Sequence, residues 1–191
     1  MQGFFIVLFF FWPWDVSGQY LLPATSLNPI GNAVYQKASH EPFSGQANPA
    51  AVSRINSSWG IMAEQKFLLR ELSFACFSLV LSNKNSGAGL FVNYTGDFLN
   101  FQSSGGLLLA RNLGKVAVGI GITRHQWKMA GYGNQVQYTG SAGCLFELSP
   151  KCMMGLAATP VMVSHPSQEG LIPVARKFGW GVGYRSEEHT S

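Results

Sequence analysis

The chain has 191 residues, of which 12% are charged and 13% aromatic, with 22 glycines and a formal net charge of +4. Low charge combined with many aromatic residues excludes a disordered chain, and Ala, Glu, Lys and Arg are too scarce for a coiled coil. The basic residues are scattered, whereas nucleic-acid binding needs them clustered on one face, so we expect no nucleic-acid partner. The mean hydropathy is too low for a bundle of transmembrane helices. An apolar soluble β protein or a membrane protein built from strands remains.

At the N-terminus, residues 4–12 form an unbroken apolar run. The run is too short to span a bilayer, but it fits the apolar core of a secretory signal peptide. Small residues, Ser17 and Gly18, precede Gln19 as they do at a cleavage point. We therefore expect residues 1–18 to be a signal peptide and the mature protein to be exported.

Residues 19–53 are rich in proline and asparagine, which predicts turns and irregular structure with one short helix around 31–37. The segment also carries apolar side chains, which favour burial. We expect it to pack against the lumen-facing side of the first strands as a possible plug. In this interpretation Asn48, Pro49 and Ala50 make the tight turn that leads into the first strand.

Residues 54–184 contain apolar runs separated by short turn clusters, a spacing typical of antiparallel strands. The predicted strands cover residues 57–67, 70–82, 88–95, 106–111, 115–128, 135–148, 151–163 and 176–184. Short turns at 112–114 and 149–150 alternate with longer connections at 97–105 and 130–134. Alternation of short and long loops is typical of an outer-membrane barrel.

The sixth predicted strand has two different faces. One face carries polar residues such as Gln137 and Glu147, and the other carries Val136, Tyr138 and Phe146. Several predicted strands also reach the 9–11 residues that membrane strands need, whereas soluble strands usually have about 5–6. The fold class that we predict is all-β, an antiparallel transmembrane β-barrel of which about eight strands are present. A secreted or surface-displayed β-sandwich with an adhesive or structural role is the alternative.

No residues in the sequence form a recognisable catalytic, cofactor or metal site. His40, His125 and His165 are not at metal-ligand spacing from one another or from a cysteine. There is no Gly-x-Ser-x-Gly motif, and the glycines at 119–121 are not followed by a helix-forming segment. We therefore expect no enzyme activity, no cofactor and no metal.

Several short motifs are similar to those of a known family. Gly31-Asn32-Ala33, then Asn48-Pro49-Ala50, then a long first strand resemble the start of FadL-like outer-membrane barrels, above all the PorV/PorQ-like subgroup associated with type IX secretion. The resemblance implies a barrel of about fourteen strands at full length, with the N-terminal segment in or near the lumen. It also implies passage of hydrophobic small molecules or an accessory role in protein secretion. The expected partners are outer-membrane lipid and either such molecules or secretion-system proteins. The six motif residues carry over as a structural element only.

Residues 185–191 break the preceding alternation of glycine and aromatic residues and look like a translated sequencing adapter. We expect them to be an artificial tail behind an N-terminal fragment of a longer barrel. Such a fragment has too few strands to close at the family's diameter. The expected fold is therefore a curled open sheet, in which the first and last strands do not pair.

Overall fold

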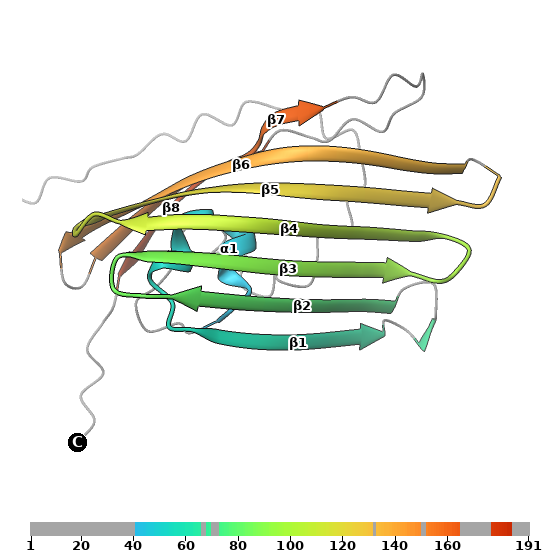
Figure 1. The fold of residues 1–191 in the computed structure, drawn as a ribbon, viewed down its shortest axis with the longest axis horizontal. Coiled ribbons are helices and arrows are strands. Elements are labelled where there is room, and N and C mark those ends of the chain that lie inside the picture. Colours follow the sequence, from blue (N-terminus) through green and yellow to red (C-terminus); the bar gives the residue numbers. More distant parts are fainter. Residues whose placement is uncertain are drawn as a thin grey trace, which may run out of the picture.

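The computed structural model describes residues 41–65, 68–69, 73–131, 133–149, 152–164 and 177–184. They form a single sheet of eight strands in chain order, each antiparallel to its neighbours (Figure 1). The strands are β1 (Ser58–Gln65), β2 (Ser73–Ser82), β3 (Ser86–Gly96), β4 (Phe101–Asn112), β5 (Val116–Met129), β6 (Gly133–Ser149), β7 (Cys152–Ser164) and β8 (Lys177–Tyr184). The predicted all-β antiparallel fold is confirmed. The predicted signal peptide, the helix at 31–37 and the tail at 185–191 lie outside the described residues.

The fourth strand differs most from its predicted range, because it begins at Phe101 instead of residue 106. Gly105 and Gly106 therefore lie inside β4 and do not mark its start. Gly106 is paired with Phe91 of β3. A side chain at this glycine would meet the Phe91 ring, with its Cβ 2.6 Å from the nearest ring carbons. The glycine thus makes room for an aromatic ring on the neighbouring strand.

The connections are also more even than predicted. Because β4 and β6 begin earlier, only residues 97–100 and 130–132 connect β3 to β4 and β5 to β6. Both connections are short, so the predicted long loops at 97–105 and 130–134 are wrong. The longer segments that separate strands are residues 66–72 and 165–176.

The sheet is curved and open (Figure 1). Among the described residues β1 pairs only with β2, and β8 pairs only with β7. The predicted open sheet is therefore confirmed. Its two faces follow from the alternation of side chains along each strand.

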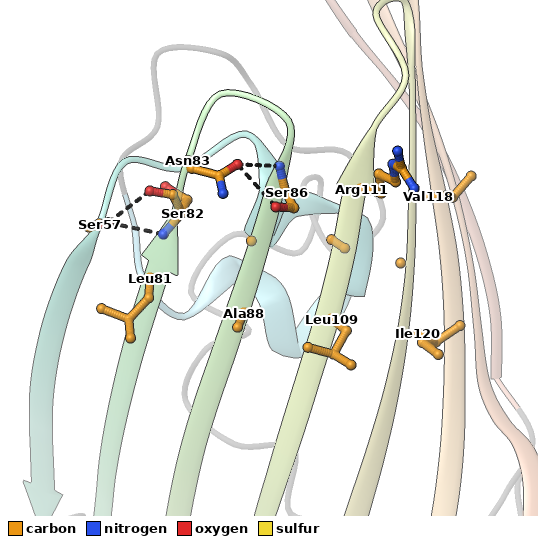
Figure 2. A pocket seen from close by; sticks show the side chains of 13 residues that line it. Ser57, Leu81, Ser82, Asn83, Ser86, Ala88, Leu109, Arg111, Val118 and Ile120 are labelled. Carbon is orange, nitrogen blue, oxygen red and sulfur yellow. Dashed lines mark hydrogen bonds between the residues drawn. The ribbon is translucent and has the colours of Figure 1, made fainter.

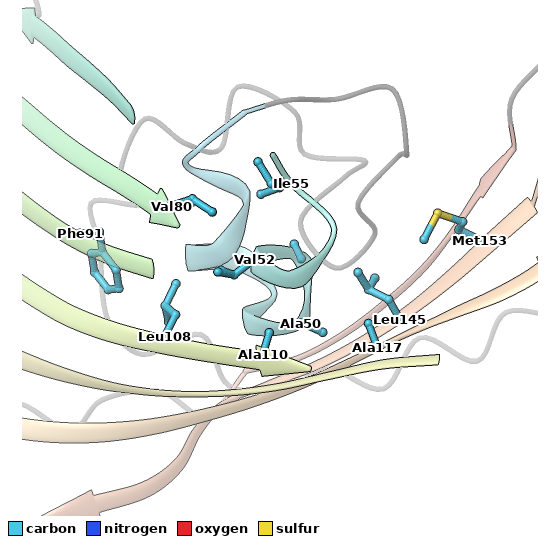
Figure 3. Close-up of a cluster of buried hydrophobic side chains, with 11 residues drawn as sticks. Ala50, Val52, Ile55, Val80, Phe91, Leu108, Ala110, Ala117, Leu145 and Met153 are labelled. Carbon is cyan, nitrogen blue, oxygen red and sulfur yellow. The ribbon is translucent and has the colours of Figure 1, made fainter. Parts of the chain in front are cut away.

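Two short helices lie on the concave face (Figure 3). They are α1 (Ser44–Ala47) and the 3₁₀ helix η2 (Pro49–Ser53). Residues 44–55, called the plug below, pack most closely against the middle strands β3 to β6. We expected contact with the first strands. Phe43 does pack with Met62 of β1 and Phe74 of β2, and Ser78 of β2 donates to the Pro42 backbone oxygen, but η2 contacts β4 and β5 more extensively than β2. The main buried cluster joins the plug to the sheet and consists of Ala50, Ala51, Val52, Ile55, Val80, Phe91, Leu108, Ala110, Ala117, Leu145 and Met153.

Candidate functional site

A row of small residues on the concave face forms the seat of the plug. Cross-strand pairing aligns one such residue on each of six neighbouring strands: Gly87, Ala110, Gly119, Gly143, Ala157 and Gly179. At three of these glycines an added Cβ would clash with the plug: Gly87 with the Val52 backbone, Gly119 with Pro49 and Ala50, and Gly143 with the Asn48 side chain. Glycine in a strand often marks such a close approach of another backbone. The small residues thus allow η2 to lie directly on the strands.

Asn48 connects this helix to the sheet. Its side chain is 2% exposed, and its Oδ1 accepts a hydrogen bond from the Ala50 N–H at 3.0 Å, which caps η2. Its Nδ2 donates to the backbone oxygens of Cys144 and Leu156, both at 3.3 Å. One carboxamide therefore caps the helix and binds two adjacent strands, β6 and β7.

The other end of the plug is held by an ion pair. The Arg54 guanidinium lies 3.0 Å from the Glu147 carboxylate and also donates to the Gly114 backbone oxygen at 3.0 Å. The Arg54 side chain is nearly buried, so these contacts are poorly screened by water. Together with Asn48 they fix the plug to β6, β7 and the β4–β5 turn.

Further along the strands the concave face is polar. A second cross-strand row contains Cys76, Asn93, Ser104, His125 and Gln137, one on each of β2 to β6. We call it the polar row. Most of its members are hydrogen-bonded, and Asn93 Nδ2 donates both to Ser104 Oγ at 3.3 Å and to Gln46 Oε1 of the plug at 2.8 Å. The polar row is therefore joined to the plug at Gln46.

The far end of the polar row is aromatic and contains an unsatisfied amide. His125 Nε2 lies 2.9 Å from Thr139 Oγ1, and the imidazole stacks on the Trp127 ring with centroids 5.6 Å apart. Gln137 is 0% exposed, and neither of its side-chain polar atoms has a hydrogen-bond partner among the described residues. Asn93 Oδ1 is likewise unsatisfied. Buried amides normally have partners, so Gln137 and Asn93 Oδ1 are exceptions on this part of the face.

The predicted motif residues are only partly described. Gly31, Asn32 and Ala33 lie outside the described residues, as do His40 and His165. The structure brings Asn48, Pro49 and Ala50 together at the start of η2. Their geometry is a capped helix start seated on the sheet, which differs from the expected turn that leads straight into the first strand.

The side chains that could ligate a metal are dispersed over the described ranges. No group of three or more His, Cys, Asp or Glu side chains there could hold a metal ion. Cys76, Cys144 and Cys152 are free thiols. No helix in the described part of the chain is both long enough and apolar enough to cross a bilayer.

Comparison with known proteins identifies no relative. The chain matches no family model, no curated protein and no solved structure. The similarity to FadL-like barrels therefore remains a prediction from the sequence motifs.

Proposed function

We propose that the eight strands form part of the wall of an outer-membrane β-barrel whose polar lumen is narrowed by the plug. In this proposal the protein has no catalytic role. It works in transport of hydrophobic small molecules or as an accessory in protein secretion. The observation that carries the proposal is the distribution of side chains, with apolar residues exposed on the convex face and a row of polar residues buried on the concave face beyond the apolar cluster under the plug.

The convex face presents large apolar side chains in aligned rows. One row joins Trp59, Leu79, Leu90, Leu107 and Ile122 across β1 to β5. At the other edge Phe178, Trp180 and Val182 of β8 are exposed. A soluble monomer rarely exposes so large a continuous apolar surface, whereas the outside of a membrane barrel requires one.

Part of the concave face buries polar side chains. Asn93, Gln137, Thr139 and Ser78 are buried there, in positions that a soluble sandwich would fill with apolar side chains. Strand length agrees, because β3 to β7 contain 11 to 17 residues, enough for a tilted strand to cross a bilayer. Both features support a polar lumen bounded by a lipid-facing wall.

The membrane part of the proposal is tested by two matched substitutions. Ile122 lies midway along β5 on the convex face and is 56% exposed, and Leu113 in the β4–β5 turn is 60% exposed. In a soluble protein, arginine at either exposed site changes stability by no more than about 0.5 kcal/mol. In a bilayer, Ile122→Arg costs about 2–4 kcal/mol because it places a charge near the middle of the lipid, whereas Leu113→Arg lies outside the apolar band and costs little.

The measurement is urea unfolding of the full-length protein refolded into phosphatidylcholine vesicles, with vesicle flotation as a check on insertion. A large difference between the two variants supports the membrane wall. Equal small effects, with a wild-type chain that stays soluble without detergent, would instead favour the β-sandwich and contradict the proposal.

Whether the plug gates the lumen distinguishes transport of small molecules from an accessory role in secretion. The plug occupies the concave face of β3 to β6, so any solute that follows this surface must displace it. If the barrel conducts solutes, Asn48→Asp should loosen the plug and increase liposome swelling in the assembled protein. Unchanged swelling with normal assembly would remove the gating role and leave the accessory role.

A further inference from the structure

A hollow of about 720 Å³ lies on the convex face, close to the β2–β3 and β4–β5 turns (Figure 2). Polar residues of the strand ends and turns, Ser57, Ser82, Asn83 and Ser86, line one side of it, and two cross-strand rows form its floor. The first joins Leu81, Ala88, Leu109 and Ile120, and the second joins Arg111 and Val118. The hollow is thus apolar on its floor and carries one guanidinium at its edge.

Ala88 explains why the surface is hollowed at this point. It is paired with Leu81 on one side and Leu109 on the other, and all three side chains are exposed on the same face. A methyl group between two leucines leaves a depression about as wide as one strand, since neighbouring strands lie about 4.8 Å apart. A linear hydrocarbon chain fits such a depression better than a globular side chain does.

Arg111 gives the hollow its charge. The residue is exposed and forms no ion pair with any described residue, and Lys84 and Lys115 lie on the two adjacent turns. At this end of the strands the carboxylate of Glu147 is already paired with Arg54. The other described acidic strand residue, Glu64, lies near the opposite end of β1, so the region around Arg111 is positively charged.

We propose that this hollow binds an anionic glycerophospholipid, with an acyl chain over Leu81, Ala88 and Leu109 and the phosphate at Arg111. The inference rests on the proposal that the convex face lies in a membrane, and it names a specific lipid partner for that face. Arginine at the boundary of an apolar band can reach the headgroup region and donate two hydrogen bonds to phosphate oxygens. All connections at this end of the strands are short, whereas the two longer segments, 66–72 and 165–176, join strands at the opposite end. Since the end with short turns faces the periplasm in outer-membrane barrels, the proposed site belongs to the periplasmic leaflet.

The test is lipid retention in native mass spectrometry of the full chain, released from nanodiscs of equal parts phosphatidylglycerol and phosphatidylcholine. We expect the wild type to retain phosphatidylglycerol preferentially. Arg111→Gln should reduce that preference about five-fold, which corresponds to about 1 kcal/mol for one basic residue near a membrane surface. The matched control is Arg124→Gln. Arg124 lies on β5 and is exposed like Arg111, but its guanidinium already donates to Gln126 Oε1 at 3.0 Å.

A second variant tests the shape of the hollow without changing charge. Ala88→Leu should fill the depression and reduce retention of both lipids. Three results would overturn the proposal: equal phosphatidylglycerol retention by wild type and Arg111→Gln, an equal loss in Arg124→Gln, or a bound adduct of water-soluble glycerol phosphate in lipid-free micelles. Failure of the wild type to enter nanodiscs would instead contradict the membrane wall itself, so the two failures are distinguishable.

Discussion

Replacement of Asn48 by aspartate tests whether one side chain holds the plug on the sheet. The two side chains have nearly the same shape, and aspartate keeps the Oδ1 that accepts from the Ala50 N–H. It loses the Nδ2 that donates to the Cys144 and Leu156 backbone oxygens. A carboxylate oxygen would then face two carbonyl oxygens at a site that is 2% exposed. The isosteric change should therefore be more harmful than truncation.

The expected magnitudes follow from these contacts. Asn48→Ala removes a helix cap worth about 1 kcal/mol and two hydrogen bonds worth about 0.5–1.5 kcal/mol each, so it should cost about 2–4 kcal/mol. Asn48→Asp leaves an uncompensated buried charge, for which about 3–5 kcal/mol is typical. The matched control is Asn83→Asp in the exposed β2–β3 turn. There Oδ1 accepts from the Asn85 and Ser86 N–H groups and aspartate can do the same, so the change should stay within about 0.5 kcal/mol.

The assay is urea unfolding in detergent micelles, followed by tryptophan fluorescence, with midpoints and slopes compared between variants. The reasoning predicts an order of stability in which the control is closest to wild type, the alanine variant is lower and Asn48→Asp is lowest. An aspartate variant as stable as the control, or more stable than Asn48→Ala, would refute the assigned donor role of Nδ2.

Three further substitutions test the seat, the ion pair and the convex face. Gly119→Ala should destabilise the chain by about 1–3 kcal/mol, because its Cβ would clash with Pro49 and Ala50. Gly105→Ala is the control and should be tolerated, since its Cβ would lie 3.6 Å from the nearest neighbouring atom. The midpoints of urea unfolding compare the two variants. Arg54→Met should lower the stability of the chain by about 1.5–3 kcal/mol, because a charged hydrogen bond to Glu147 is lost. Proteases should also cut the plug faster. An unchanged digestion rate would show that the ion pair does not hold the plug. If the convex face lies in a membrane, Cys144→Arg should cost only about 0–1 kcal/mol in vesicles, less than Ile122→Arg, because Cys144 shares a cross-strand row with Arg111 near the edge of the apolar band; equal costs would contradict this assignment of depth.

The strands could be predicted because their signal is local. Alternation of polar and apolar residues is visible within each run, and six of the eight predicted ranges agree with the structure to within about two residues at each end. β4 was the main exception, since Gly105-Gly106 has the composition of a turn. Its place inside a strand depends on Phe91, a residue of the neighbouring strand.

The seat of the plug could not be predicted because it depends on pairing between distant strands. Gly87, Gly119 and Gly143 lie far apart in the sequence and become neighbours of η2 only through the register of β3 to β6. The partners of Asn48 on the sheet are 96 and 108 residues away. Composition indicated that the segment is apolar and held in turns, but it contained no signal for which strands it would contact.

The register of the strands also determines what can cover the convex face. Leu90, Leu107 and Ile122 are single apolar residues in their own strands, and they become one surface only when β3, β4 and β5 pair in the observed register. The surface continues to Trp180 on β8, so a protein partner would need a complementary curved face as wide as the whole sheet. Lipid acyl chains adapt to such a surface without a matching shape. In the proposed barrel, lipid would cover this convex surface and the polar row on the opposite face would line the lumen.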